Sequence, residues 1–275
     1  MSIEVIPQAA ALGAEIRGVD LSKPLSNSVF SDINDAFLAH QVVFFRDQKI
    51  TPDEYAAFAR RFGPLISYMF SEGVSEEHPE ITPIVKTETS TESFGSYWHS
   101  DSTYLEKPPK ATFLYAREVP ERGGDTLFAD MYGVYEQLSP GLKTLLTPLN
   151  AVYSAGLFER DEDTYEGMHG KGKEHRFTQA IHPVIRTHDE TGRQALYVNE
   201  THTLELEGMT RDESLAILEP LYVLTKRPEF SFRLRWEPDT LTIWDNRCTQ
   251  HYALDDYDGQ RRVMHRIIAE GGLPH

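Results

Sequence analysis

The chain has 275 residues, of which 40% are hydrophobic, and a formal net charge of −16 at pH 7. A chain of this size can bury a large core. The acidic balance argues against nucleic acid as a partner, because proteins that bind it depend on Lys and Arg to neutralise phosphates. No run of about 18 apolar residues and no secretory leader is evident, so we expect a cytoplasmic protein without membrane attachment. The single cysteine, Cys248, is expected in the core as a small apolar side chain.

The first third of the chain predicts a helix, a buried strand and a second helix. Residues 27 to 41 carry apolar side chains at helical spacing, and residues 42 to 45 form the apolar run Val-Val-Phe-Phe, which is typical of a buried strand. The second helix has clear boundaries. It begins after Thr51, which can form a capping box with Glu54, and Gly63 ends it.

Beyond about residue 83 the sequence indicates strands. Short runs rich in Val, Ile, Thr, Tyr and Phe are separated by Gly, Pro, Asp and Asn, a pattern that favours β-sheet. The clearest runs are ATFLYAREV (111–119), QALYVN (194–199), FSFRLRW (230–236) and TLTIW (240–244). Helices are expected at 130 to 147, with a restart at Ser139, and at 211 to 227, where Pro220 is expected to kink or split the helix.

These elements predict one domain over residues 1 to 275, because no repeat or linker divides the chain. The expected fold class is mainly β with flanking helices, with a jelly-roll or cupin-like double sheet whose mouth forms a ligand pocket. Residues 154 to 176 are polar, contain four glycines and have no periodicity. This segment is expected to be either an active-site lid or a disordered loop.

The pair His99 and Asp101 is the first candidate for a metal site. On a strand, side chains two residues apart point to the same face, so both could bind one metal ion. Such a short motif also occurs by chance. Two similar pairs are discounted, because one encloses a proline and the other runs into a turn. They are His78 with Glu80 and His188 with Glu190. Trp98 is expected to point away from the ligands into the core.

A third ligand is available from the C-terminal stretch, where His251 precedes a cluster of basic residues. Two histidines and a carboxylate leave coordination positions open, as oxygen-activating non-haem Fe(II) requires. In a strand, Arg262 and Arg266 share one face, which suggests a pair of anion sites; the alternative is a solvated basic edge. Asp245 is expected to be a turn residue rather than a ligand.

Several long segments of the chain together form a more specific pattern than any single triplet of residues. They are LGAEIRGVDLSKPL (12–25), HQVVFFRDQKITPDE (40–54), RRFGPL (60–65), YWHSDSTYLEKPP (97–109), ERGGDTLFADM (121–131), HPVIRTHDETGRQALYVNE (182–200), KRPEF (226–230) and WDNRCTQHYALDDYDGQRRVMHR (244–266). In this order they resemble the taurine dioxygenase (TauD/TfdA) family of Fe(II)- and 2-oxoglutarate-dependent enzymes, and the resemblance covers nearly the whole chain.

The resemblance implies a double-stranded β-helix and assigns roles to several residues. The implied iron ligands are His99, Asp101 and His251, and Arg262, assisted by Thr126, would bind the far carboxylate of 2-oxoglutarate. The implied reaction uses O2, converts 2-oxoglutarate to succinate and CO2, and hydroxylates a C–H bond of a second substrate. The family also implies a homo-oligomer, either a dimer or a tetramer.

The prime substrate is less well defined by the resemblance. Arg266 matches the arginine that holds the sulfonate in taurine enzymes, whereas Tyr68, Gly95 and His202 replace a histidine, an asparagine and a phenylalanine of those enzymes. Taurine is therefore not the expected substrate. A small anionic organic compound remains, either a sulfonate, a sulfate ester or a carboxylate, and Tyr68 and His202 could equally serve only in packing.

Two other functions are compatible with the same residues. One is a catalytically silent relative that binds an organic acid as a sensor or partner protein. The other is a cupin-type hydrolase or isomerase that uses Zn or Mn, although Zn hydrolysis more usually has tetrahedral ligation and a separate general base. Fe(II)-dependent formation of succinate separates the dioxygenase from both.

Overall fold

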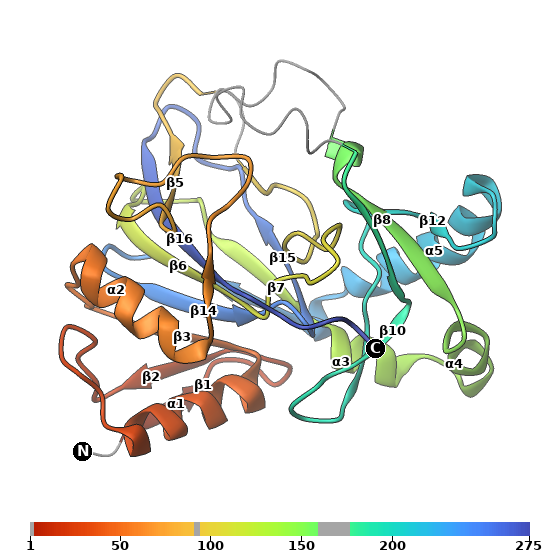
Figure 1. The fold of residues 1–275 in the computed structure, drawn as a ribbon, viewed down its shortest axis with the longest axis horizontal. Coiled ribbons are helices and arrows are strands. Elements are labelled where there is room, and N and C mark those ends of the chain that lie inside the picture. Colours follow the sequence, from red (N-terminus) through yellow and green to blue (C-terminus); the bar gives the residue numbers. More distant parts are fainter. Residues whose placement is uncertain (1–2, 91–93, 159–176) are drawn as a thin grey trace.

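A computed structural model describes residues 3–90, 94–158 and 177–275 of the chain. Its largest element is an eight-stranded sheet in the order β1-β2-β3-β14-β6-β16-β4, with β5 paired to β16 beside this path (Figure 1). The strands of this sheet are β1 (Glu4–Pro7), β2 (Ala14–Arg17), β3 (Val42–Phe45), β4 (Leu65–Ile66), β5 (Thr82–Lys86), β6 (Ala111–Glu118), β14 (Leu241–Asp245) and β16 (Arg262–Ala269). The sheet therefore combines strands from both ends of the chain.

Three smaller sheets complete the strand framework. One has the order β13-β7-β15, another the order β12-β8-β9, and β10 pairs with β11. Their strands are β7 (Thr126–Asp130), β8 (Asn150–Ser154), β9 (Gln179–Pro183), β10 (Ile185–Thr187), β11 (Gln194–Leu196), β12 (Thr203–Leu206), β13 (Ser231–Leu234) and β15 (Thr249–Ala253). Their strand pairs are antiparallel, as are those of the large sheet except the pair between β2 and β3.

The large sheet is buried on both faces because its strands alternate between two apolar clusters. In β6 and β14, Phe113 and Ile243 join the cluster that contains α1 (Asn27–His40) and α2 (Pro52–Ala59). Leu114 and Trp244, one position further along, join the cluster shared with β7 and β13. Side chains two residues apart share a face, so this alternation assembles a helix layer, the large sheet and the smaller sheet in that order.

The predicted N-terminal elements are confirmed, including both helices and the buried strand between them. Thr51 and Glu54 make both hydrogen bonds of the capping box at the start of α2, and a 3-10 turn, η1 (Arg60–Phe62), extends the helix to Gly63. The sequence did not reveal the hairpin β1-β2, whose second strand runs parallel to β3.

The later helices also lie where they were predicted, with one difference. The restart at Ser139 is confirmed, because this residue caps α4 (Pro140–Leu146) after α3 (Met131–Gln137). However, Pro220 does not split α5 (Arg211–Thr225), which continues through it. Pro220 is exposed, so water can reach the carbonyl that loses its partner, while Leu218 and Leu221 hold the inner face of the helix in the core.

The predicted strands are present, although QALYVN is extended only over Gln194–Leu196. The largest difference concerns the metal motif. His99 forms an isolated antiparallel bridge with His251, and a turn begins at Asp101, so the motif does not lie on a regular strand. Trp98 and Cys248 are both buried in the core, as expected.

Part of the predicted lid falls outside the described residues. Ser154 ends β8 and Ala155–Phe158 form a 3-10 turn, η2, whereas residues 159–176 belong to the part of the chain that is not described. A further 3-10 turn, η4 (Pro228–Phe230), precedes β13. Among the helices that are described, none has the length and apolar character needed to cross a membrane.

A buried ionic network fixes the end of β14 next to the centre of the molecule. Asp245 ends this strand, and its carboxylate accepts two hydrogen bonds from the Arg247 side chain, at 2.8 and 2.7 Å. His188 donates to the same carboxylate over 3.0 Å, because its Nδ1 atom accepts the backbone N–H groups of Glu190 and Thr191 and its Nε2 atom must carry the hydrogen. Arg247 and Asp245 are each 1% exposed, so their charges compensate each other away from water.

We predict that Asp245→Asn lowers the free energy of unfolding by about 3–5 kcal/mol, because it leaves the Arg247 guanidinium buried without its main anionic partner. Asp189→Asn is the matched control, since Asp189 also binds Arg247, at 2.9 Å, but its side chain is 47% exposed. That variant should lose less than about 1 kcal/mol. Denaturant unfolding of both variants measures the difference, and equal losses would contradict the role given to Asp245.

The same contact predicts how this difference depends on pH. Burial alone would raise the pKa of the Asp245 carboxyl, but the charge and hydrogen bonds of Arg247 and the hydrogen bond from His188 outweigh it and lower the pKa. The stabilisation is therefore complete above the pKa of an unfolded aspartate, about 3.9, and is lost as the pH falls further. The gap between wild type and Asp245→Asn should be constant near neutrality and shrink below about pH 4.

Candidate active site

The three residues predicted to bind iron lie together in the interior of the protein. One ligand atom from each of His99, Asp101 and His251 lies within 4.8 Å of the others. The backbones of the two histidines exchange hydrogen bonds of 3.1 and 2.8 Å, which bring a loop before β6 onto β15. The structure therefore joins residues about 150 positions apart into one set of donors with the composition of a two-histidine, one-carboxylate metal site.

The protonation states of this triad suit a metal ion. The Nδ1 atom of His99 lies 2.7 Å from the carbonyl oxygen of Tyr97, so Nδ1 carries the hydrogen and Nε2 keeps its lone pair. Burial lowers the pKa of His99, and burial together with the neighbouring His99 lowers the pKa of His251 to about 3. Burial alone would raise the pKa of Asp101, but His251, Arg266 and His99 lower it to about 2. Two neutral imidazoles and a carboxylate anion result.

A second group with the composition of a metal site does not have free donors. The ligand atoms of His188, Asp245 and Cys248 also lie within 4.8 Å of one another. However, both ring nitrogens of His188 and both oxygens of Asp245 already take part in the ionic network described above, and burial raises the pKa of the Cys248 thiol. The turn predicted after the pair His188 and Glu190 is present at residues 189–191. Asp245 was expected to be a turn residue, but it is the last residue of β14 and forms an ion pair with Arg247.

Arg262 lines the same cavity as the triad, from the first position of β16. It is 6% exposed, and its Nε and Nη2 atoms have no hydrogen-bond partner among the residues that the structure describes. Thr126 lies in the same cavity, where its hydroxyl accepts a hydrogen bond of 2.9 Å from the Trp236 indole. The guanidinium of Arg262 faces that indole ring at 5.8 Å. A buried cation with unused donors indicates a site for an anion.

Arg266 lies four residues further along β16 and faces the same cavity. It is 4% exposed, and its Nε and Nη2 atoms make no hydrogen bond within the described part of the chain. Its Nη1 atom lies 3.6 Å from Oδ1 of Asp101, and its guanidinium stacks over the ring of Tyr68 at 4.1 Å and near that of Phe94 at 5.4 Å. The alternative of a solvated basic edge is wrong for both arginines, because both are buried. Arg261, the preceding arginine of the same basic cluster, is exposed and pairs with Glu118.

The two remaining predicted substrate residues lie in different surroundings. Gly95 lines the cavity in a left-handed conformation (φ 84°), and a Cβ atom there would lie 3.4 Å from the Cε1 atom of His99. It therefore keeps space open beside the triad. His202 is 1% exposed and does not line this cavity. Its ring meets those of His99 and Tyr104 edge-on at 6.0 and 5.1 Å, and its Nδ1 atom lies 2.9 Å from the Thr103 hydroxyl.

The cavity lies between the large sheet and the sheet β13-β7-β15. Apolar side chains that the sequence did not single out complete its wall. They are Ile84, Phe94, Leu114, Trp244 and Ala253. ATFLYAREV and TLTIW were predicted as strands, but which of their positions border a cavity depends on the packing of two sheets. No pattern in one sequence gives that arrangement.

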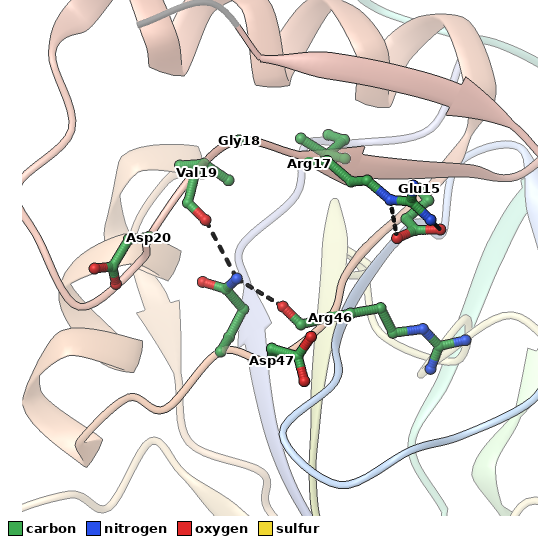
Figure 2. Close-up of a pocket in the computed structure, with 9 residues that line it drawn as sticks. Glu15, Arg17, Gly18, Val19, Asp20, Arg46 and Asp47 are labelled. Carbon is green, nitrogen blue, oxygen red and sulfur yellow. Dashed lines mark hydrogen bonds and ion pairs between the residues drawn. The ribbon is translucent and has the colours of Figure 1, made fainter.

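A second hollow, on the surface near β2 and the end of β3, has no comparable chemistry. Figure 2 shows that Arg17 is paired with Glu15 and that an amide group bridges the carbonyl oxygens of Val19 and Arg46. This amide belongs to Gln48, whose oxygen accepts the backbone N–H of Leu21 over 2.9 Å. Arg17, Glu15 and the Gln48 amide are already bonded within this hollow, and none of its residues belongs to a group of described residues with the composition of a metal site.

The family model described as "Taurine catabolism dioxygenase TauD, TfdA family" matches residues 3–268. The chain belongs to this family. An α-ketoglutarate-dependent sulfate ester dioxygenase of Pseudomonas putida is 32% identical over all of this chain and 91% of its own length. The (S)-phenoxypropionate/α-ketoglutarate-dioxygenase of Sphingobium herbicidovorans is 30% identical over 98% of this chain and 95% of its own.

A crystal structure of a taurine dioxygenase from Burkholderia xenovorans has the same fold. It superposes with a TM-score of 0.85 and 33% identity, covering 100% of this chain and 93% of that chain. The predicted family, the mainly β fold with flanking helices and the enzyme class, a 2-oxoglutarate-dependent dioxygenase, are therefore confirmed. α-Ketoglutarate in these names is 2-oxoglutarate.

Proposed function

We propose that this protein uses Fe(II), 2-oxoglutarate and O2 to hydroxylate a small anionic organic compound, with succinate and CO2 as co-products. The observation that carries the proposal is the composition of one buried cavity, which contains a two-histidine, one-carboxylate triad and two arginines with unused donors. The metal ligands in this proposal are His99, Asp101 and His251. Bound Fe(II) would supply the activation of O2, since three protein ligands leave positions open on an octahedral ion.

The proposed site for 2-oxoglutarate is Arg262 with Thr126. The planar guanidinium can bind a carboxylate through two parallel hydrogen bonds, and two of its nitrogen atoms are unused. The Thr126 hydroxyl accepts from Trp236, so its own hydrogen remains available to a carboxylate oxygen. This pair and the triad border one cavity. One carboxylate of 2-oxoglutarate would bind Arg262 and Thr126, and the opposite end of the molecule would then reach the metal.

The proposed anchor of the prime substrate is Arg266. Its guanidinium is fixed between the ring of Tyr68 and Oδ1 of Asp101, so an anionic group that binds it would lie beside the triad. Gly95 would leave room for the rest of the molecule. The named relatives support an anionic substrate, since they act on a sulfate ester, on (S)-phenoxypropionate and on taurine. His202, behind the triad, would influence the pocket through its contacts with His99.

The surrounding residues have a defined part in this reaction. Apolar side chains of both sheets exclude water from the cavity, which strengthens every charge interaction within it. The two arginines hold the co-substrate and the substrate by their anionic groups, so that a C–H bond is oriented rather than free to rotate. We further propose that the chain acts as one catalytic domain, because β1 and β16 belong to the same sheet. A homo-oligomer and a cytoplasmic location remain predictions.

The first test is metal content combined with succinate formation. Purified protein is expected to bind one Fe(II) per chain, and His99→Ala, Asp101→Ala and His251→Ala should each abolish succinate formation coupled to substrate oxidation. Wild-type turnover in Asp101→Ala would show that the triad is wrong. A protein that binds 2-oxoglutarate without ever forming succinate would instead be the catalytically silent relative, and turnover with Zn(II) but not Fe(II) would indicate a hydrolase.

The second test separates the two neighbouring arginines, Arg262 and Arg261. Arg262→Ala should raise the KM for 2-oxoglutarate about 10- to 150-fold, since a hydrogen bond to a charged group contributes about 1.5–3 kcal/mol. Arg261→Ala is the matched control, because its side chain is exposed and pairs with Glu118 at 2.9 Å. It should leave this KM unchanged. The reverse result would move the co-substrate site to Arg261.

The third test concerns the charge of the prime substrate. A panel of sulfonates, sulfate esters and carboxylates screened for succinate release identifies the best substrate, which is then compared with its neutral amide or ester. Wild type should strongly prefer the acid, because a neutral analogue leaves the Nε and Nη2 atoms of Arg266 without an anionic partner. Arg266→Ala should lose most of this preference for the acid. Its metal content is measured in parallel as a control. If wild type turns over both compounds equally, Arg266 has another role.

A further inference from the structure

Asp101 has a second set of contacts that the proposed reaction does not use. Its Oδ1 atom faces the triad, 3.9 Å from Nε2 of His99 and 3.6 Å from Arg266. Its other oxygen, Oδ2, accepts a hydrogen bond of 2.6 Å from the hydroxyl of Thr112. Thr112 lies on the inner face of β6 and is 0% exposed. The two oxygens of the carboxylate therefore have different partners.

A third residue, Asn246, fixes the direction of that hydrogen bond. Its amide nitrogen donates to the oxygen of Thr112 over 2.8 Å. Its amide oxygen accepts from the backbone N–H of Asp101 at 3.3 Å and from the Trp244 indole at 3.1 Å. A backbone N–H and an indole N–H can only donate, so the amide orientation is determined by its partners. The Thr112 oxygen receives a hydrogen from Asn246 and must direct its own hydrogen at Asp101.

We infer that Thr112 and Asn246 are positioning residues for the metal ligand Asp101, and that they hold its carboxylate so that Oδ1 alone is presented to the metal. The inference rests on the proposed function, because it concerns the ligand set given above. Thr112 occupies Oδ2, so the carboxylate would bind through a single oxygen and leave more of the coordination sphere open.

The closed ring of contacts makes this orientation rigid. Asn246 binds the backbone of Asp101 at one side, while Thr112 binds its side chain at the other. All three residues are at most 3% exposed, so water does not compete for these hydrogen bonds. Partners of this kind typically contribute 10- to 100-fold to metal affinity, because they orient the ligand before the ion arrives.

The test measures the affinity for Co(II) alone by calorimetry, without 2-oxoglutarate or prime substrate. Thr112→Val keeps the shape of the side chain and removes the hydroxyl, and Asn246→Ala removes the amide that directs it. Each is expected to weaken Co(II) binding by about 10- to 100-fold. Thr112→Ser retains the hydroxyl and should restore most of the affinity. Both residues act through one carboxylate, so their effects should not add. The Co(II) affinity of the double variant should lie within about threefold of that of the weaker-binding single variant.

The matched control is Thr242→Val. Thr242 is also 0% exposed and lies on the inner face of the neighbouring β14, but its hydroxyl has no hydrogen-bond partner among the described residues. This variant should bind Co(II) as wild type does. The visible spectrum of the Co(II) form gives a second readout, since a carboxylate that binds through both oxygens changes the coordination number.

The outcomes separate this inference from the proposed function. If wild type binds no Co(II), the ligand set and the inference both fail. If wild type binds it and either Thr112→Val or Asn246→Ala, in folded form, binds equally well with an unchanged spectrum, only the inference is wrong. Equal losses in Thr112→Ser and Thr112→Val would also overturn it, because the hydroxyl would then not be the cause.

Discussion

The antiparallel contact between the loop that carries His99 and strand β15 is the interaction on which the site depends. Besides the two hydrogen bonds between His99 and His251, Gly95 accepts from Ala253 at 3.0 Å and the Ser100 hydroxyl donates to the carbonyl of Thr249 at 2.6 Å. The loop is thus attached at several points along β15, although it forms no regular strand. This attachment brings His99 and Asp101 next to His251, which lies about 150 positions further along the sequence.

The buried arginines illustrate how the same residue type serves two purposes. Arg247 is surrounded by acidic groups of its own chain and stabilises the fold, whereas Arg262 and Arg266 keep nitrogen atoms without partners in the described structure. Leaving buried donors unused costs stability. Arg262 and Arg266 line the cavity that holds the triad, where an anionic ligand would offset this cost.

Much of this arrangement could be predicted from the sequence, for identifiable reasons. Local signals such as the Thr51 capping box placed the helices, and strand alternation put Arg262 and Arg266 on one face. Pro220 does not split α5, because the packing of the inner face of the helix outweighs its local effect. The hairpin β1-β2 was missed because its strands are short. Thr112 and Asn246 gave no signal, since a buried threonine in a strand looks the same whether or not its hydroxyl meets a carboxylate.

The place of β16 in the large sheet has a consequence for synthesis on the ribosome. This strand lies between β6 on one side and β4 and β5 on the other, yet it occupies residues 262–269 and is made after all of them. At about 5–20 residues per second, β6 waits roughly 7 to 30 seconds for β16. During that time the backbone edge of β6 is unpaired in the nascent chain, and its side chains Phe113 and Tyr115 are not yet covered. Such exposed strands are recognised by chaperones and can aggregate with neighbouring chains.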